Sequence, residues 1–210
     1  MVELDYARLQ DTQVSADPYP HVVVPDFVPE RTLADVVADL PAMSQRGSFP
    51  ISALRFGPRA AAFMHELEGP ALRTAIAEKF GLDLSGAGTM VTLRGQSGDR
   101  DGQIHTDSTA KRVTILLYLN PASAAWARQE GCLRLLRGPD DLDDYAVEVP
   151  PVNGTLLVFP NGPNTWHGHK KFFGQRYVVQ LNYMTADRAA RAELRRHRLS
   201  ALFKRVTRAA

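Results

Sequence analysis

The chain of 210 residues is 44% hydrophobic and 23% charged, a composition that excludes a mainly disordered protein and fits one domain with room for an appendage. No apolar run approaches the roughly 18–20 residues of a membrane span, and the early acidic residues, with no apolar stretch beside them, argue against a secretory signal. Cys132 is the single cysteine, which excludes an intrachain disulfide framework, so we expect a reducing, cytoplasmic location.

The net charge of +2 is distributed unevenly. Residues 185–210 carry eight basic and two acidic residues, whereas the rest of the chain carries 17 basic and 21 acidic residues. The mildly acidic body argues against nucleic acid as a partner. Two interpretations of the basic C-terminal tail are open. It contacts an acidic partner, a polyanion or an anionic membrane surface, or it is a capping helix that packs on the domain, which we expect for its proximal half.

The first half of the chain predicts mixed structure. A β-branched run over 21–24 predicts a short strand. Apolar residues at helical spacing predict one helix over about 29–40 and another over about 66–80, where Gly81 supplies a stop. Residues 42–62 show little clear period.

From about residue 88 onward, short β-rich runs alternate with clusters of glycine, proline, asparagine and aspartate. Such a series predicts an antiparallel sandwich or jelly roll. We therefore expect one domain over 1–184, with helical support over 1–87 and a jelly-roll core over 88–184, followed by a basic C-terminal helix over 185–210. The predicted strands lie near 89–94, 103–107, 112–119, 131–136, 145–149, 154–159, 164–168 and 175–184.

The sequence His105-Thr106-Asp107 places an imidazole and a carboxylate two residues apart. Residues i and i+2 of a strand face the same side of the sheet, so these two side chains would converge. The pair alone is weak evidence, because this spacing arises by chance and also fits a simple hydrogen bond between His105 and Asp107.

A second cluster, Trp166-His167-Gly168-His169, follows later in the chain. In a jelly roll, strands that are distant in sequence become neighbours, so His167 can join His105 and Asp107 around one metal. Two histidines and one carboxylate on one face of a metal leave positions open, which suits a non-haem Fe(II) that activates O₂. Arg176 lies nine residues after His167, and a guanidinium near the metal can hold a carboxylate bidentately.

Taken in order, these motifs resemble the 2-oxoglutarate- and Fe(II)-dependent oxygenase superfamily, most closely its prolyl-4-hydroxylase-like branch. The resemblance covers residues 88–184 well and the N-terminal helices loosely. The motifs that carry it are His105-x-Asp107, Tyr118-Leu119-Asn120, Gly131-Cys132-Leu133, Gly154-Thr155-Leu156, His167 and Arg176.

The resemblance implies a mainly β protein with flanking helices, built on a double-stranded β-helix of the jelly-roll or cupin-like type. It implies Fe(II) held by His105, Asp107 and His167. It also implies 2-oxoglutarate that chelates the metal while Arg176 clamps its distal carboxylate. O₂ is then the oxidant, and ascorbate keeps the iron reduced.

Two departures from the family pattern leave the rest of the cosubstrate pocket unassigned by resemblance. A tyrosine that helps to hold the cosubstrate would fall just after Arg94, where this chain has Gly95, and the small hydroxyl residue two after the arginine is Val178. Strand parity offers further candidates for binding the cosubstrate, which are Thr114, Tyr118, Gln180 and Asn182. For each of them, the competing interpretation is that the side chain only makes a hydrogen bond within the protein.

His167 and His169 share one strand parity, so parity cannot choose the ligand between them. The spacing to Arg176 is nine residues from His167 and seven from His169. Because the longer spacing is nearer the family pattern, we assign His167 to the metal and expect His169 at the pocket rim or behind the ligands.

The resemblance therefore implies a hydroxylase that acts on a C–H bond of a small molecule or a side chain and releases succinate and CO₂. Because related halogenases lack the carboxylate, the resemblance also implies that Asp107 favours hydroxylation over halogenation, while desaturation and ring formation stay open. The alternatives are a non-enzymatic jelly-roll module that binds a metal or ligand, and an oxidative demethylase that acts on nucleic acid. We expect the substrate walls to come from residues 42–62, 95–104 and 121–130.

Overall fold

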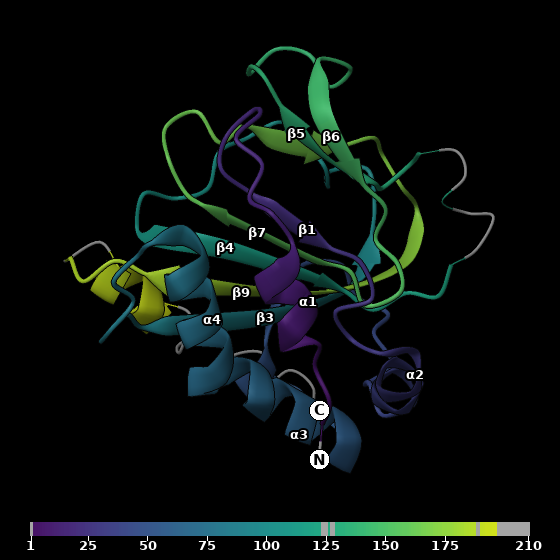
Figure 1. Ribbon diagram of the computed structural model, residues 1–210. Helices are drawn as coiled ribbons and strands as arrows, with labels where there is room; N and C mark the ends of the chain where they lie inside the picture. Colours follow the sequence, from purple (N-terminus) through teal and green to yellow (C-terminus); the bar gives the residue numbers. More distant parts are fainter. Residues whose placement is uncertain (1, 123–125, 127–128, 188–189, 197–210) are drawn as a thin grey trace.

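The computed structural model describes residues 2–122, 126, 129–187 and 190–196. Two antiparallel sheets face each other, and Figure 1 shows the smaller one above the larger one. The larger sheet has the strand order β1-β7-β4-β9-β3-β2, and the smaller has β6-β5-β8. The strands are β1 (Val22–Val24), β2 (Phe49–Pro50), β3 (Thr89–Ser97), β4 (Lys111–Tyr118), β5 (Leu133–Leu136), β6 (Tyr145–Val149), β7 (Leu156–Pro160), β8 (His167–His169) and β9 (Gly174–Met184).

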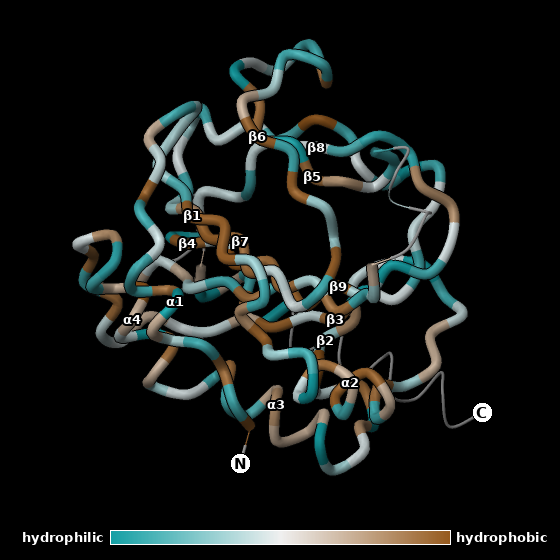
Figure 2. The backbone as a smooth tube through the Cα atoms, turned by 45° about the vertical axis from the view of Figure 1, so that its right-hand side comes forward, coloured by the Kyte–Doolittle hydropathy of each residue, from teal (hydrophilic) through white to brown (hydrophobic). Residues whose placement is uncertain are grey.

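The alternation of side chains along the strands divides the larger sheet into two faces. On β4, for example, Ile115 and Leu117 join the main core with the helices, whereas Leu116 and Tyr118 pack toward the smaller sheet. Figure 2 shows the hydrophobic segments gathered in β1, β4 and β7, with hydrophilic segments in the surrounding loops. The residues that face the smaller sheet therefore line the space between the two sheets.

The helices cover the face of the larger sheet that lies away from the smaller sheet (Figure 1). They are α1 (Tyr6–Asp11), α2 (Glu30–Ala38), α3 (Pro58–Glu68) and α4 (Pro70–Phe80), and a single 3₁₀ turn (Ile51–Ala53) follows β2. Buried side chains such as Leu9, Phe63 and Leu72 join them to the core. None of the helices in the described ranges has the length and apolar character needed to cross a membrane.

The helix predicted over about 66–80 is present as α4, but its predicted start is wrong, because two helices meet at Gly69 and residues 66–68 belong to α3. Gly69 is extended, with φ −69° and ψ 169°, and it caps both α3 and α4. A proline disfavours helical backbone in the residue before it but is well placed in the first turn of a new helix, so Pro70 ends one helix and begins the next. The expected stop at Gly81 is confirmed, with a left-handed φ of +63°.

Most strands of the second half are confirmed within a few residues, and the helix expected over 29–40 and the strand over 21–24 are present as α2 and β1. The strand expected over 103–107 is wrong: this segment makes only an isolated bridge between His105 and His167. Helix α1 and strand β2 were not predicted, because neither is long enough to show a period.

The C-terminal segment is helical over residues 190–196. Ala190 is buried with Met184 and Ala110, and Leu194 packs against this small cluster. The proximal part of the tail is therefore a helix that packs on the domain, as expected, although it starts later than Ala186. The remainder of the predicted helix, 197–210, lies outside the described residues.

Candidate metal centre and adjoining cavity

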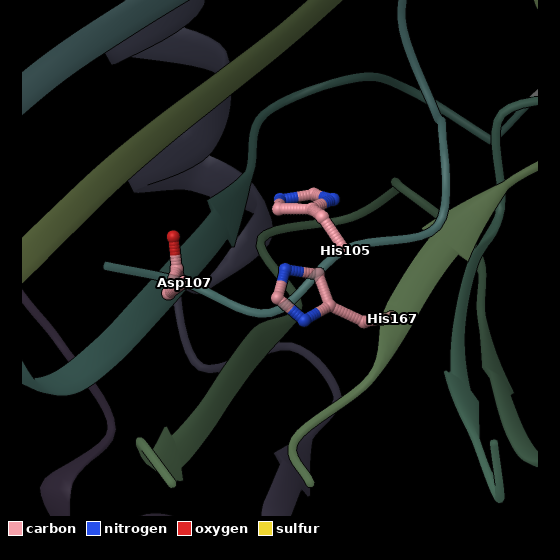
Figure 3. A group of neighbouring side chains, drawn as sticks. All are labelled: His105, Asp107 and His167. Carbon is pink, nitrogen blue, oxygen red and sulfur yellow. The ribbon is translucent and has the colours of Figure 1, made fainter. Parts of the chain in front are cut away.

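His105, Asp107 and His167 each offer one ligand atom, and these atoms all lie within 4.8 Å of one another (Figure 3). The two histidines are paired through the backbone: each N–H donates to the other's carbonyl at 3.0 Å. Their rings lie 4.4 Å apart, centre to centre. Sequence reasoning placed His105 and Asp107 on a regular strand, but the structure brings them together from a loop held against the first residue of β8.

A backbone carbonyl fixes the tautomer of each of the two histidines. Nδ1 of His105 lies 2.8 Å from the carbonyl oxygen of Gln103, and Nδ1 of His167 lies 2.9 Å from that of Thr165. Since a carbonyl only accepts, Nδ1 carries the proton and Nε2 keeps its lone pair for a metal. Burial, with a smaller effect from His105, lowers the pKa of His167 to about 4, so its ring is neutral at pH 7.

Asp107 is buried, with its side chain 5% exposed, and both of its oxygens have partners. The ammonium of Lys111 donates to Oδ1 at 2.5 Å and the hydroxyl of Thr114 donates to Oδ2 at 2.6 Å. Burial alone would raise the pKa of Asp107, but Lys111, His167 and these hydrogen bonds together lower it below its ordinary value. The carboxylate is therefore ionised and available as a ligand.

Thr114 also joins Asp107 to two side-chain amides, of which that of Asn182 is buried. Nδ2 of Asn161 donates to the Thr114 hydroxyl at 2.8 Å, and Nδ2 of Asn182 donates at 3.0 Å. Thr114 thus contacts the Asp107 carboxylate directly, and Asn182 is linked to it through the Thr114 hydroxyl. Both residues were predicted to bind the cosubstrate. Sequence reasoning missed Lys111 and Asn161. The four-residue spacing from Asp107 could have indicated Lys111, but no pattern points to Asn161.

A cavity of about 270 Å³ opens beside the histidine pair and reaches Arg176. Arg176 is buried, its Nε donates to the carbonyl of Gly131 at 2.9 Å, and it takes part in no ion pair within the described part of the chain. Burial lowers its pKa, yet an arginine remains charged at neutral pH. A buried guanidinium without a carboxylate partner is suited to an anionic ligand.

Tyr118 lies in the same cavity, with its ring centre 5.5 Å from the Arg176 guanidinium carbon. Its hydroxyl is buried and has no hydrogen-bond partner among the described residues. Burial raises the pKa of Tyr118 to about 12, with Arg176 acting in the opposite direction. An unpartnered phenol beside an unpaired guanidinium fits a carboxylate that both would bind. Gln180, also predicted as a candidate, lines this cavity as well.

His169 lines the cavity on the side of Arg176 and is not part of the three-residue metal group. Its Nδ1 lies 2.8 Å from the carbonyl oxygen of Lys170. Burial and then Arg176 lower the pKa of His169 to about 4, so it is also neutral at pH 7. The geometric cluster thus contains His167 rather than His169, although both rings come from β8.

One of the two departures from the family pattern has a visible cause. Gly95 lies so close to Met43 that a Cβ would come 2.5 Å from the Met43 Cβ, which leaves no room for a side chain there. Val178 lines the cavity with its aliphatic side chain. Of the expected wall segments, 95–104 contributes through Arg100–Ile104, while much of 121–130 lies outside the described residues.

Comparisons with known proteins agree with this architecture. Residues 93–184 match the model of the 2OG-Fe(II) oxygenase superfamily. A Pseudomonas putida prolyl-4-hydroxylase is 18% identical, with 89% of this chain and 95% of that chain covered and a TM-score of 0.58. A Trichoplax adhaerens prolyl hydroxylase, solved with a peptide fragment of the hypoxia inducible factor oxygen degradation domain, is also 18% identical, with 89% and 93% covered and a TM-score of 0.55.

The iron-bound HygX from Streptomyces hygroscopicus is 11% identical, with 79% of this chain and 82% of that chain covered and a TM-score of 0.54. At these identities the structural likeness shows the fold, which is the double-stranded β-helix expected from the sequence. No curated protein sequence matches the chain.

Proposed function

We propose, on the premise that residues 93–184 belong to the 2OG-Fe(II) oxygenase superfamily, that this protein is a dioxygenase that hydroxylates a C–H bond of a small molecule or a side chain. The reaction would consume 2-oxoglutarate and O₂ and release succinate and CO₂. The observation that carries the proposal is the group of three ligand atoms within 4.8 Å, beside a cavity that ends at an unpaired, buried Arg176.

In this proposal His105, Asp107 and His167 hold Fe(II), and Arg176 with Tyr118 binds the distal carboxylate of 2-oxoglutarate. The bound iron and 2-oxoglutarate supply the activation of O₂, and ascorbate would keep the iron reduced. A guanidinium gives this carboxylate a bidentate partner, which fixes its orientation as well as its position. One domain over residues 1–184 would contain the metal ligands and the residues that bind 2-oxoglutarate.

In this proposal the protein's own residues orient the metal ligands and exclude water from the reacting centre. The carbonyls of Gln103 and Thr165 hold the two imidazoles with Nε2 free, and the Thr114 hydroxyl holds Oδ2 of Asp107. The cavity wall between the histidines and Arg176 includes apolar side chains, which limit the water that reaches the reacting centre; these are Leu116, Leu133 and Val178.

The experiment that tests the proposal is an anaerobic titration of Fe(II)-loaded protein with 2-oxoglutarate, read by the visible metal-to-ligand charge-transfer band. We expect a band in the natural chain, a much weaker affinity in Arg176→Gln, and no band in His167→Ala. Arg137→Gln, which removes an arginine from the surface, is the matched control and should titrate as the natural chain does.

Absence of the band in protein that holds one iron would contradict the proposal and would support a metal-binding module without oxygenase chemistry. A nucleic-acid substrate would instead be indicated by binding that falls steeply with salt concentration, as phosphate contacts require.

A further inference from the structure

A second cavity, of about 430 Å³, opens on the metal group and shares Arg94, His105 and Gln180 with the first. Its wall is largely polar, with Pro50 and Met90 as its apolar members. The other lining residues are Ser48, Thr92, Asp107, Lys111, Asn182, Glu193 and Arg196. Since the first cavity leads to Arg176, this second opening gives a further molecule access to the same metal ligands.

The C-terminal helix supplies part of this wall. Ala190 and Leu194 anchor it to the domain, and Oε2 of Glu193 accepts a hydrogen bond from the Ser108 hydroxyl at 2.9 Å. Glu193 and Arg196 are three residues apart and so lie on the same side of the helix, where both line the cavity. The basic tail therefore belongs to the surroundings of the site.

The charges of the cavity do not balance once a metal is bound. Arg94 is already paired with Asp101 at 2.6 Å. Lys111 is only 12% exposed, and Asp107 is its one carboxylate partner among the ion pairs of the described ranges. A metal ion held by Asp107 would draw on the negative charge that now faces Lys111, and a largely buried ammonium without its full counter-charge is costly.

Arg196 adds a second cation, because it forms no ion pair or hydrogen bond with the described residues. Glu193 is the one lining acid that is not a ligand of the metal in the proposed function. Two cations thus face one anion in a polar cavity.

We propose that this second cavity holds the primary substrate and that the substrate carries an anionic group, a carboxylate or a phosphate, which pairs with Lys111 and Arg196. The inference rests on the proposed dioxygenase function and gives it a substrate class. The polar wall formed by Ser48, Thr92 and Gln180 is suited to a substrate with hydrogen-bonding groups near that anion.

The test uses the full chain loaded with Mn(II) and saturated with 2-oxoglutarate, with methyl phosphate and acetate as separate probes. Paramagnetic Mn(II) speeds the relaxation of a probe's methyl protons only when the probe binds near the metal. We expect at least one probe to show this effect, Arg196→Gln to weaken its binding about tenfold, and Glu193→Gln to strengthen it.

Arg195→Gln is the matched control, because it removes the same charge from an exposed position beside Arg196 on the same helix. An effect on methyl phosphate alone assigns a phosphorylated substrate, and an effect on acetate alone assigns a carboxylate. The inference is overturned if neither probe relaxes faster, or if Arg196→Gln and Arg195→Gln behave alike. Failure of the Fe(II) charge-transfer titration would instead overturn the dioxygenase function, so the two failures are distinguishable.

Discussion

The hydroxyl of Thr114 lies 2.6 Å from Oδ2 of Asp107 and at the same time receives two amide donors. A hydroxyl has one proton and two lone pairs, so with both lone pairs taken by Asn161 and Asn182 its proton is directed to the carboxylate. This arrangement fixes Oδ2, while Oδ1 accepts from the Lys111 ammonium, so a metal ion bound at Oδ1 would share that oxygen with Lys111 or displace it. The orientation of Asp107 is thus set by residues that do not contact the metal themselves.

Replacement of Thr114 tests this network. Thr114→Val keeps the shape of the side chain but removes the hydroxyl, and we expect Fe(II) affinity to fall between about 10-fold and 100-fold, the range for partners that orient metal ligands. Thr114→Ser retains the donor and should restore most of the affinity. Equilibrium dialysis under anaerobic conditions measures both variants. Equal affinity in Thr114→Val and the natural chain would contradict the role.

The choice of ligand on β8 is tested by two matched substitutions. His167→Asn should abolish tight Fe(II) binding, because His167 lies within the 4.8 Å group. His169→Asn should retain one iron per chain and weaken 2-oxoglutarate binding instead, since His169 lines the cavity near Arg176. Metal content and the charge-transfer titration separate the two effects. Retention of iron by His167→Asn would show that the assignment is wrong.

Removal of the unpartnered Tyr118 hydroxyl should raise the stability of the metal-free protein and lower its affinity for 2-oxoglutarate. Tyr118→Phe should stabilise the metal-free protein by about 1 kcal/mol, because a buried hydroxyl without a partner is removed. The same change should weaken 2-oxoglutarate binding about tenfold, if that hydroxyl donates to its carboxylate. Urea unfolding and the charge-transfer titration measure the two quantities.

Tyr183→Phe provides the control for Tyr118→Phe. Its hydroxyl is also buried and has no hydrogen-bond partner in the described part of the chain, but Tyr183 belongs to the core on the helix-covered face of the sheet. We expect Tyr183→Phe to raise stability and leave 2-oxoglutarate affinity unchanged. A loss of affinity in both variants would point to a general effect on the sheet.

The stability of the metal-free protein should depend on pH through its buried histidines. The pKa values of His167 and His169 are lowered to about 4 in the folded chain, so the unfolded chain binds protons more readily as the pH falls below about 6.5. Folding stability is therefore lost between about pH 6.5 and pH 4, by at most about 1.4 kcal/mol per pH unit for each histidine.

Urea unfolding between pH 7 and pH 4.5 measures this slope, and His169→Asn should reduce it by removing one of the two groups. A flat profile in the natural chain would contradict the expected protonation states. Asp107, whose pKa is lowered, adds a loss of stability only at pH values below this window.

Substitution by alanine should destabilise the protein at Gly102 but not at Gly138. Gly102 has a φ of +87°, and a Cβ there would come 2.3 Å from the carbonyl oxygen of His169. We expect Gly102→Ala to destabilise the protein by about 2 kcal/mol and to weaken 2-oxoglutarate binding, because the wall beside His169 must shift. Gly138→Ala, where a Cβ would meet nothing within 4 Å, is the control and should change neither quantity.

The parts of the fold and site that sequence reasoning predicted are those encoded in local patterns. Short β-rich runs between turn clusters identify β4 and β9, and the ordered motifs predict that His105, Asp107 and His167 lie at one site. The break between α3 and α4 was missed although Gly69-Pro70 marks it, because apolar residues continue at helical spacing across the junction.

Other features depend on contacts that no local pattern records. His105 is held by pairing with His167, which is distant in sequence, so a strand over 103–107 was the wrong expectation. Asn161 reaches Thr114 from the loop after β7, and the C-terminal helix reaches the second cavity through Arg196. Both contacts depend on the three-dimensional arrangement of the two sheets.

The two backbone hydrogen bonds between His105 and His167 have a consequence for how such a protein can diversify. The separation of the two imidazoles is set by that pair and by the carbonyls of Gln103 and Thr165, each of which is only two residues away from the histidine it holds. Insertions and deletions in the loops that join β4 to β5 and β5 to β6 would therefore leave the separation of the two imidazoles in place. Evolution or an engineer could exchange those loops to change what is oxidised while the same metal stays bound.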